Sequence, residues 1–581
     1  MNPISSATKK PSASSHGGGV RGADLSRRSS QFEGRFGRMF RTLPPAEWRT
    51  EDLRKLGEAM TSQPEHAPNN SNLPGAALED AKKIIQDNEE NSGISAGYTY
   101  LGQFIDHDIT FDPASSLQKL NDVDGLVDYR TPRLDLDSLY GRGPDDQPYM
   151  FDGKKFRLGR PLFENGKKSK SRDLPRYDMS VDDGLQKRAL IGDKRNDENV
   201  IVSQLHGAMM QFHNKLLDAM QAASPGKLEP SFPEVQRMVR WHYQWVVVND
   251  YLVKLCGQDV VHSILPHLVK NEPIWKNKPA FQFYKPKEDA FMPIEFAAAA
   301  FRFGHSMVRP IYRLNTELKG DGPNSAEGKA GIAGRFFIFA GVQDRGLNGF
   351  DAFPKEWAID WSLYFDINGS GKKPGQARVQ PSYKIDTALV NPLGFLPEFS
   401  HVVPQTLPLT IAQLQAKPKD AEHSPAGLAQ RNLLRGMAMA LPSGQDVAQA
   451  MGLTPIDDKN LRICKAVIED WDAPGTPNMS AFQNGAFKGK APLWYYVLAE
   501  AQYEWIQRAK VSAGRRGGKG DEEPMTMGPV GGRIIAETLI GLLWADGHSY
   551  LRQAPNWKPQ DAGLVGGKTF DMGKLIEFAL R

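Results

Sequence analysis

The feature that most constrains the fold is a set of long segments whose apolar residues recur every three or four positions. Residues 200–220 and 232–255 show this spacing, and residues 534–543 show it again. Such spacing places the apolar side chains on one face of an α-helix. Segment 294–302, with four consecutive alanines, is predicted to be a further helix, whereas β-rich stretches such as 335–340 are few. We therefore expect a mainly α protein with long loops and little β-structure.

The chain of 581 residues is predicted to be one large domain behind a short tail. At about 150 residues per domain, length alone would suggest three or four domains. Polar interruptions such as residues 63–72 are followed directly by sequence with apolar periodicity, so none has the character of an interdomain linker. Residues 1–40 are rich in Ser, Gly, Lys and Arg and are predicted to be disordered. Residues 41–581 are predicted to form the single folded domain.

Composition and charge exclude several classes of protein. The net charge of +4 is small for this length and no basic stripe is interleaved with aromatic residues, so nucleic-acid binding is not expected. The chain has no run of about 18 apolar residues, so no membrane span is expected, and its N-terminal residues lack the apolar core of a signal peptide. Cys256 and Cys464 are the two cysteines, and neither lies in a metal-binding cluster. A thiolate iron ligand, a zinc site or a disulfide framework is therefore not expected.

Two segments place histidine, glutamine, arginine and carboxylates at helical spacing. In YTYLGQFIDHDITFDP, Gln103 and His107 are four apart and would share a helix face, with Asp106 beside them. In GDKRNDE, Arg195 and Glu198 are three apart and would also share a face. Taken alone, the first group is more often a capping or salt-bridge cluster, and the second pair is more often a surface ion pair.

Two further segments supply a buried histidine and a partner for it. His305 follows a strongly apolar stretch in AFRFGHSMVRP, and Asn432 and Arg435 lie one turn apart in NLLRGMAMALPSG. A lone buried histidine is usually a core residue with satisfied hydrogen bonds. It becomes a metal-ligand candidate when a partner such as Asn432 can orient its second ring nitrogen.

In this order, the four segments resemble those of the animal-type haem peroxidases of the peroxidase–cyclooxygenase superfamily, which includes myeloperoxidase and lactoperoxidase. GQFIDHD is similar to the distal helix of that family, GDKRNDE to its distal arginine motif and FRFGH to its proximal helix. GMAMALPSGQ is similar to the version in bacterial members, and two cysteines cannot form the disulfide framework of the animal members. The likeness covers the chain from about Gly75 to near the C-terminus. It implies a single large helical haem-peroxidase domain over residues 41–581.

The resemblance also implies a role for each matched residue. His107 would be the distal base that takes a proton from peroxide and returns it to the leaving oxygen, a task that needs a neutral imidazole. Arg195 would stabilise the developing negative charge, and Gln103 would orient the bound peroxide or halide. His305 would be the proximal iron ligand, with Asn432 accepting the hydrogen bond from its Nδ1–H.

Other matched positions concern attachment of the haem. Asp106 and Glu198 resemble the two carboxylates that form ester links to haem b in the family. Arg302 and Arg435 would meet haem propionates, since guanidinium and carboxylate groups pair in a bidentate way. Asn199 stands where myeloperoxidase has a methionine bonded to the haem, so no sulfonium link is expected.

A calcium site is the second metal centre that the resemblance implies. In TPRLDLDSLYG, Thr131, the Arg133 carbonyl, Asp135 and Asp137 alternate by two and, with Asp108, offer only oxygen ligands, which suits Ca²⁺. Without the resemblance, a polar surface loop is the simpler interpretation. A serine is usual where this chain has Asp137, so the site would carry one more negative charge.

The implied activity is that of a haem peroxidase: an oxidoreductase that reduces H₂O₂, forms compound I and oxidises halides, thiocyanate or small aromatic donors, in the response to oxidative stress. The second hypothesis is a fatty-acid dioxygenase, but such enzymes carry a catalytic tyrosine three residues before the proximal histidine, where this chain has Arg302. The third is a non-catalytic haem-fold protein used in adhesion, which would not need His107, Arg195 and Gln103. The sequence leaves the preferred donor open, and it leaves the location open between non-classical secretion and the cytoplasm.

Overall fold

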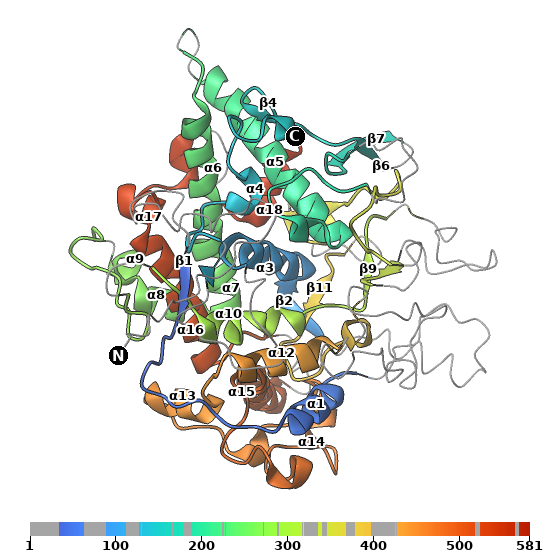
Figure 1. The fold of residues 1–581 in the computed structure, drawn as a ribbon, viewed down its shortest axis with the longest axis vertical. Helices are drawn as coiled ribbons and strands as arrows, with labels where there is room; N and C mark the ends of the chain where they lie inside the picture. Colours follow the sequence, from blue (N-terminus) through green and yellow to red (C-terminus); the bar gives the residue numbers. More distant parts are fainter. Residues whose placement is uncertain are drawn as a thin grey trace, which may run out of the picture.

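Helix α3 (Ala96–Ile109) lies at the centre of the computed structural model and carries the GQFIDHD motif. It packs against α5 (Val200–Ala222) on one side, while α12 (Leu428–Ala438) and α15 (Leu493–Arg516) lie on the other side, as Figure 1 shows. The mainly helical fold predicted from the sequence is confirmed. The structure describes residues 34–62, 89–111, 127–318, 335–396 and 425–581, with shorter gaps inside the last three ranges.

The remaining described elements complete this helical body. The other α-helices are α1 (Thr50–Ala59), α4 (Asp137–Tyr140), α6 (Phe232–Val246), α7 (Leu252–Cys256), α8 (Gln258–Ile264), α9 (Pro266–Lys270), α10 (Ile294–Ala297), α13 (Gly444–Ala450), α14 (Ile468–Asp472), α16 (Pro529–Ala545), α17 (Tyr550–Gln553) and α18 (Met572–Ala579). The strands are β1 (Gly34–Gly37), β2 (Glu90–Ser95), β3 (Val127–Asp128), β4 (Phe151–Asp152), β5 (Lys155–Phe156), β6 (Pro161–Glu164), β7 (Lys167–Arg172), β8 (Met292–Pro293), β9 (Ile311–Arg313), β10 (Arg335–Phe337) and β11 (Pro381–Tyr383).

Helix α5 shows why its residues form a long helix. Asn199 caps it, since its side-chain oxygen accepts hydrogen bonds from the backbone N–H groups of Ile201 and Val202. Its first four turns are buried all round, so that its stability comes from packing against neighbouring helices. The helix predicted over 232–255 is α6 followed by α7, joined by the π-helical turn η4 (Val247–Tyr251). Such turns redirect side chains and are frequent near functional sites.

The single helix predicted over residues 294–302 is wrong. Helix α10 ends at Ala297, Ala299 has φ −136° and ψ −80°, and the 3₁₀-helix η5 begins at Ala300 and ends at His305. The Arg302 guanidinium Nε donates a hydrogen bond of 2.9 Å to the carbonyl of Ala297, the residue at which α10 ends. Tertiary contacts therefore override the high helix propensity of alanine.

The described strands are short and form one three-stranded and four two-stranded sheets. The three-stranded sheet has the order β3-β1-β8, and β1 is parallel to β8. Strand β1 and the buried side chains of Phe36, Met39 and Phe40 lie within the segment predicted to be a tail. The folded part therefore already includes residue 34, and the predicted boundary at residue 40 is too late.

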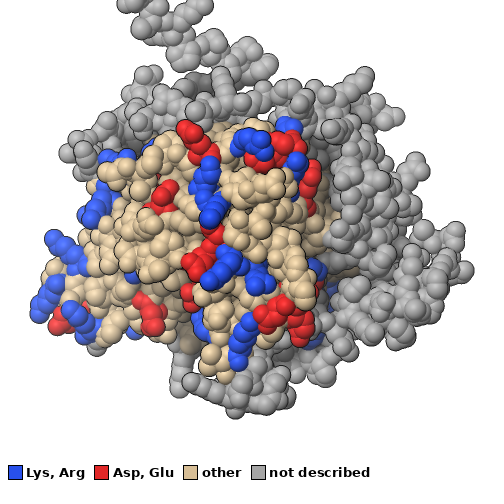
Figure 2. Space-filling view, turned by 90° about the horizontal axis from the view of Figure 1, so that it is seen from below, with Lys and Arg blue, Asp and Glu red and all other residues tan. Residues whose placement is uncertain are grey.

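Charged residues of both signs share the surface, and both cysteines lie among the described residues. Lys and Arg are interspersed with Asp and Glu over the face in Figure 2, which shows no continuous basic stripe there. Cys256 is buried, Cys464 is half-buried, and both are free thiols. None of the described helices combines the length and apolar character required to cross a membrane.

Candidate active site

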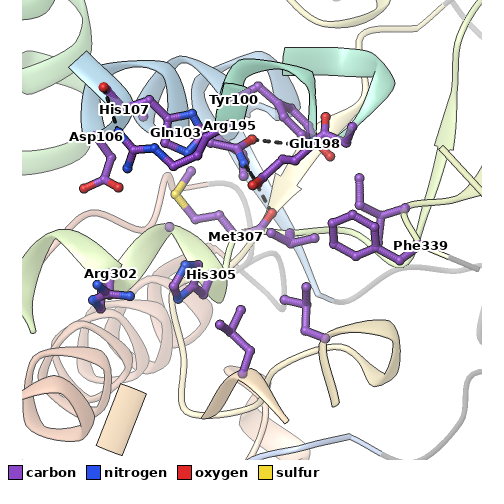
Figure 3. A pocket seen from close by; sticks show the side chains of 18 of the residues that line it. Tyr100, Gln103, Asp106, His107, Arg195, Glu198, Arg302, His305, Met307 and Phe339 are labelled. Atoms are coloured by element: carbon purple, nitrogen blue, oxygen red, sulfur yellow. Dashed lines mark hydrogen bonds between the residues drawn. The ribbon is translucent and has the colours of Figure 1, made fainter. Parts of the chain in front are cut away.

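A cavity of about 690 Å³ lies between α3 and η5. Residues of α3 and of the segment 195–199 line one wall, and residues of η5 line the opposite wall (Figure 3). Apolar side chains, among them Ile338, Phe339, Leu393 and Leu428, form much of the remaining lining. A volume of this size with an apolar lining and a few polar groups is typical of a cofactor site.

Helix α3 directs the polar side chains singled out in its motif into the cavity. Gln103, Asp106 and His107 all line it, because residues three and four apart share one face of an α-helix. The next residue, Asp108, is turned by about 100° around the helix and lies outside the cavity, in a buried acidic cluster. The four residues therefore serve two separate sites.

The imidazole of His107 is held by Asn196, which the sequence analysis did not single out. Nδ1 of His107 lies 2.9 Å from Oδ1 of Asn196, and Nδ2 of Asn196 lies 3.1 Å from Nδ1 of His206. An amide oxygen only accepts hydrogen bonds, so His107 Nδ1 carries the proton and Nε2 keeps its lone pair. Burial, followed by the charge of Arg195, lowers the pKa of His107 to about 4, so the ring is neutral above that pH.

Arg195 lies beside His107 in the short 3₁₀-helix η3 (Lys194–Asp197). Asp193 caps this helix and also receives hydrogen bonds from Nε and Nη2 of Arg195, the latter at 2.8 Å. Nη2 also donates to the carbonyls of His107 (3.0 Å) and Thr110 (2.7 Å), and the guanidinium lies over the Phe111 ring. Nη1 of Arg195 has no hydrogen-bond partner among the described residues, and the Arg195 side chain lines the cavity.

The remaining polar groups of this wall form a second network. Gln103 Nε2 donates to Glu198, and Gln103 Oε1 accepts from Asn199 Nδ2 at 3.2 Å. The Asp106 carboxylate accepts a hydrogen bond of 3.0 Å from the Thr110 hydroxyl. Asp106 and Glu198 thus present two carboxylates to the cavity from different elements, α3 and the end of η3.

On the opposite wall, η5 presents Arg302 and His305. Residues i and i+3 eclipse one another in a 3₁₀-helix, so both side chains face the cavity although the predicted α-helix is absent. Burial, with a smaller effect of Arg302, lowers the pKa of His305 to about 3. The imidazole is therefore neutral, which is the form that binds a metal.

Asn432 reaches His305 from α12, but its amide is turned in the opposite sense to the prediction. Nδ2 of Asn432, not Oδ1, faces His305 Nδ1 at 2.8 Å, and Oδ1 accepts a hydrogen bond of 3.2 Å from Arg302 Nη1. The contact of Arg435 with a haem propionate stays a prediction. Arg435 lies one turn further along α12 and does not line the cavity.

The residues of the cavity fit a haem. The His305 ring lines the cavity, and its Nδ1 lies against the Asn432 amide. Its Nε2 makes no hydrogen bond with a described residue. The Arg302 guanidinium lies on the same wall, where it can pair with a carboxylate. The apolar lining suits a porphyrin face, and the carboxylates of Asp106 and Glu198 line the same cavity.

The carboxylates of Asp108, Asp135 and Asp137 form a buried cluster, with ligand oxygens within 4.8 Å of one another. The Thr131 hydroxyl donates to Asp135 at 2.9 Å, and Arg133 belongs to the same loop, its N–H bound to the Thr131 carbonyl. Burial, followed by the charges of its two aspartate neighbours, raises the pKa of Asp108 well above its usual value. A buried cluster of this kind is consistent with a site for a hard cation such as Ca²⁺.

Arg130 connects this acidic cluster to the cavity wall, and the sequence analysis missed it. Its guanidinium pairs with Asp137 (Nη1–Oδ1 3.3 Å) and with Asp193, and all three side chains are buried. Burial alone would raise the pKa of Asp193, but Arg195 and Arg130 outweigh it and hold that pKa well below its usual value. Asp193 is therefore a fixed negative charge. The helix-capping position of Asp193 was the one local signal in the sequence that could have identified it.

Comparisons with known proteins agree with this geometry. The sequence model described as "Animal haem peroxidase" matches residues 123–330. The probable oxidoreductase PXDNL of Homo sapiens is 28% identical over 133 residues, which cover 22% of this chain and 8% of that protein. Thyroid peroxidase of Rattus norvegicus is 26% identical over 132 residues, covering 22% and 13%. Heme peroxidase 2 of Caenorhabditis elegans is 24% identical over 300 residues, covering 43% and 40%.

The matched segments span well under two thirds of these relatives. Among solved structures, Peroxidase A from Dictyostelium discoideum superimposes with a TM-score of 0.51 at 13% identity, over 94% of this chain and 93% of that one. At this identity the likeness shows the fold. The family match includes Arg195, His305 and the acidic loop. The fold brings Arg195 and His305 to one cavity with the GQFIDHD helix. Over residues 123–330 the chain is similar to the animal haem peroxidase family.

Proposed function

We propose that the protein is a haem peroxidase that reduces H₂O₂ and oxidises small anionic or phenolic donors such as halides, thiocyanate or small aromatic compounds. The observation that carries the proposal is the pairing of two walls across one cavity. His107 and Arg195 supply a base and a cation on one wall, and His305 offers a free imidazole nitrogen on the other. Such an arrangement suits cleavage of a peroxide bound between them.

His305 would hold the haem iron through Nε2, and bound haem would supply the redox chemistry. With Nε2 on the metal, Nδ1 has to carry the proton, so the Asn432 amide has to present its oxygen to His305. Turning the amide by 180° withdraws the acceptor from Arg302 Nη1. The Arg302 guanidinium, which already lines the cavity, would then take a haem propionate as its partner. Asp106 and Glu198 are the proposed points of ester attachment to haem b.

The distal residues would handle the proton and the charge. His107 Nε2, with its lone pair fixed by Asn196, accepts a proton from H₂O₂ and returns it to the departing oxygen. Arg195 is clamped by Asp193 with Nη1 still available, so a cation stands ready where negative charge develops. Gln103, held by Glu198 and Asn199, would orient the bound peroxide or a halide.

The acidic cluster is the proposed Ca²⁺ site, with Asp108, Thr131, the Arg133 carbonyl, Asp135 and Asp137 as ligands. Asp137 stands where a serine is usual in the family, and Arg130 offsets its additional charge at 3.3 Å. The GMAMALPSGQ segment and the two free thiols support the proposal of a bacterial-type member with one catalytic domain after the N-terminal tail. A role in the response to oxidative stress would follow from the proposed activity.

The proposal is tested with purified, haem-loaded protein. We expect a Soret band, and H₂O₂-dependent oxidation of iodide or guaiacol that falls by orders of magnitude in His107→Ala while haem stays bound. An oxygen electrode should record no uptake on addition of linoleate, because Arg302 occupies the position of the tyrosine that a fatty-acid dioxygenase requires. Uptake with linoleate and no turnover of small donors would instead identify a dioxygenase. Haem binding with neither reaction would identify a non-catalytic haem protein.

A further inference from the structure

One tyrosine that lines the cavity, Tyr98, is hydrogen-bonded to a buried carboxylate. Tyr98, in the first turn of α3, lines the cavity and is otherwise buried, with 6% of its surface exposed. Its hydroxyl lies 2.7 Å from Oδ1 and 2.9 Å from Oδ2 of Asp250. The two residues are 152 positions apart and meet because the π-helical turn η4 directs Asp250 towards the start of α3.

Asp250 is held ready to receive a proton. Its Oδ2 also accepts the backbone N–H of Met572 at 2.9 Å, and Lys254 Nζ lies 3.9 Å from its Oδ1. Burial raises the pKa of Asp250 to about 6, so the carboxyl group is ionised at neutral pH. Burial, followed by the charge of Asp250, raises the pKa of Tyr98 well above its usual value, so the phenol keeps its proton.

A neutral phenol can give up an electron readily only if its proton leaves at the same time, and a hydrogen-bonded base makes that transfer short. Lys254 lies 5.4 Å from the centre of the Tyr98 ring, and this nearby cation disfavours a positive charge on the ring. The Lys254 side chain is 39% exposed, so the chain Tyr98–Asp250–Lys254 runs from the cavity to the surface. Among the described residues, none of the groups proposed to act on peroxide or to hold the haem makes a hydrogen bond or ion pair with Tyr98, Asp250 or Lys254.

We propose that Tyr98 is a redox-active tyrosine with Asp250 as its proton acceptor. The proposal rests on the proposed function, since peroxide-oxidised haem is the oxidant. In the step, the O–H bond of Tyr98 breaks, its electron reduces the oxidised haem by one equivalent, and its proton forms an O–H bond on Asp250. A one-electron donor such as a phenol then supplies an electron to the tyrosyl radical, and the proton returns from Asp250. Tyr98 thus relays oxidising equivalents from the cavity to aromatic donors.

The test is electron paramagnetic resonance on haem-loaded protein, frozen milliseconds after mixing with one equivalent of H₂O₂. We expect a radical signal that narrows when tyrosine is ring-deuterated and falls at least about tenfold in Tyr98→Phe. Asp250→Asn should lower the signal about as far, because the proton of Tyr98 then has no base to accept it. A tenfold loss corresponds to about 1.4 kcal/mol. Tyr251→Phe is the matched control, because Tyr251 lines the same cavity and its hydroxyl makes no hydrogen bond with a carboxylate among the described residues.

Each outcome decides the matter. A signal of unchanged yield in Tyr98→Phe, or no tyrosyl signal although the Soret band responds normally to peroxide, overturns the role of Tyr98 and leaves the proposed function intact. A Soret band that does not respond to peroxide overturns both. Because Tyr98→Phe could disturb α3, 2,3-difluorotyrosine at position 98 provides a second arm. It keeps the hydroxyl and should change the hyperfine pattern of the signal, and an unchanged pattern overturns the assignment.

Discussion

Asn196 is predicted to set the rate at which peroxide reacts, although it does not line the cavity. Its amide oxygen fixes the proton of His107 on Nδ1 and so leaves Nε2 free to act as a base. In Asn196→Ala this acceptor is lost in a fully buried environment. His107 can then relieve its unpaired N–H by moving the proton to Nε2, and in that tautomer the nitrogen that faces the cavity cannot accept a proton.

The size of the effect follows from the hydrogen bond. A buried neutral hydrogen bond contributes about 1 kcal/mol net, and a buried donor left without a partner costs about 1–3 kcal/mol. An unpaired Nδ1–H raises the free energy of the competent tautomer by this cost of about 1–3 kcal/mol relative to the other tautomer, which lowers its population about 5- to 150-fold. The second-order rate constant for oxidation of the haem by H₂O₂ should fall by the same factor, with the Soret band of the resting protein unchanged.

Stopped-flow absorbance at pH 7 measures this rate constant, and two variants serve as controls. Asn196→Asp keeps an acceptor for His107 and should react close to the rate of the unchanged protein. Asn91 is equally buried and makes two hydrogen bonds with the backbone of Met525, so Asn91→Ala should destabilise the fold without slowing the reaction. If folded, haem-loaded Asn196→Ala reacts with peroxide at the normal rate, the argument from the tautomer is wrong.

Four other predictions concern the haem, the calcium ion and the fold. His305→Ala should lose the Soret band of tightly bound haem, and a normal spectrum would refute the assignment of the iron ligand. After turnover with H₂O₂, haem should resist extraction into acidic butanone, and Asp106→Asn or Glu198→Gln should each weaken that retention; complete extraction from the unchanged protein would contradict the ester links. Metal analysis should find one Ca²⁺ per chain, and prolonged chelation should lower activity, whereas activity unaffected in calcium-free protein would remove the site. Burial lowers the pKa of His213 and His242 from 6.5 to about 4, so between these pH values the unfolded chain binds protons that the folded chain does not. As the pH is lowered from 6.5 to 4, the free energy of unfolding should therefore fall by about 1.4 kcal/mol per pH unit for each histidine. Denaturant titrations at pH 6.5 and 5 that give equal free energies of unfolding would contradict this.

The sequence predicted the elements whose signals are local. The helical spacing of Gln103, Asp106 and His107 is a property of α3 alone, and α5 carries a cap and an apolar period that are both visible in the chain. The local signal failed where long-range contacts decide the backbone. Four alanines favour an α-helix, yet the chain turns into a 3₁₀-helix at Ala300, and it is this tighter helix that brings Arg302 and His305 to one wall.

Contacts between distant segments could not be predicted from spacing. Asn196 meets His107 across 89 positions, and Tyr98 meets Asp250 across 152. In the sequence, Asn196 is one polar residue in a charged segment and Asp250 is one acid in an amphipathic helix. The orientation of the Asn432 amide depends on Arg302, 130 positions away, and on whether a metal occupies Nε2 of His305.

The buried carboxylate of Asp137 is best understood together with Arg130. A serine at this position would give the buried Arg130 guanidinium a neutral partner and leave it, among the described residues, with an ion pair to Asp193 alone. With Asp137 present, the guanidinium bridges the acidic loop to the residue that clamps Arg195. Asp108 links the same loop to His107, its neighbour on α3. Both groups that would act on peroxide are thus anchored to one acidic loop, so a metal bound there would position them together rather than add stability alone.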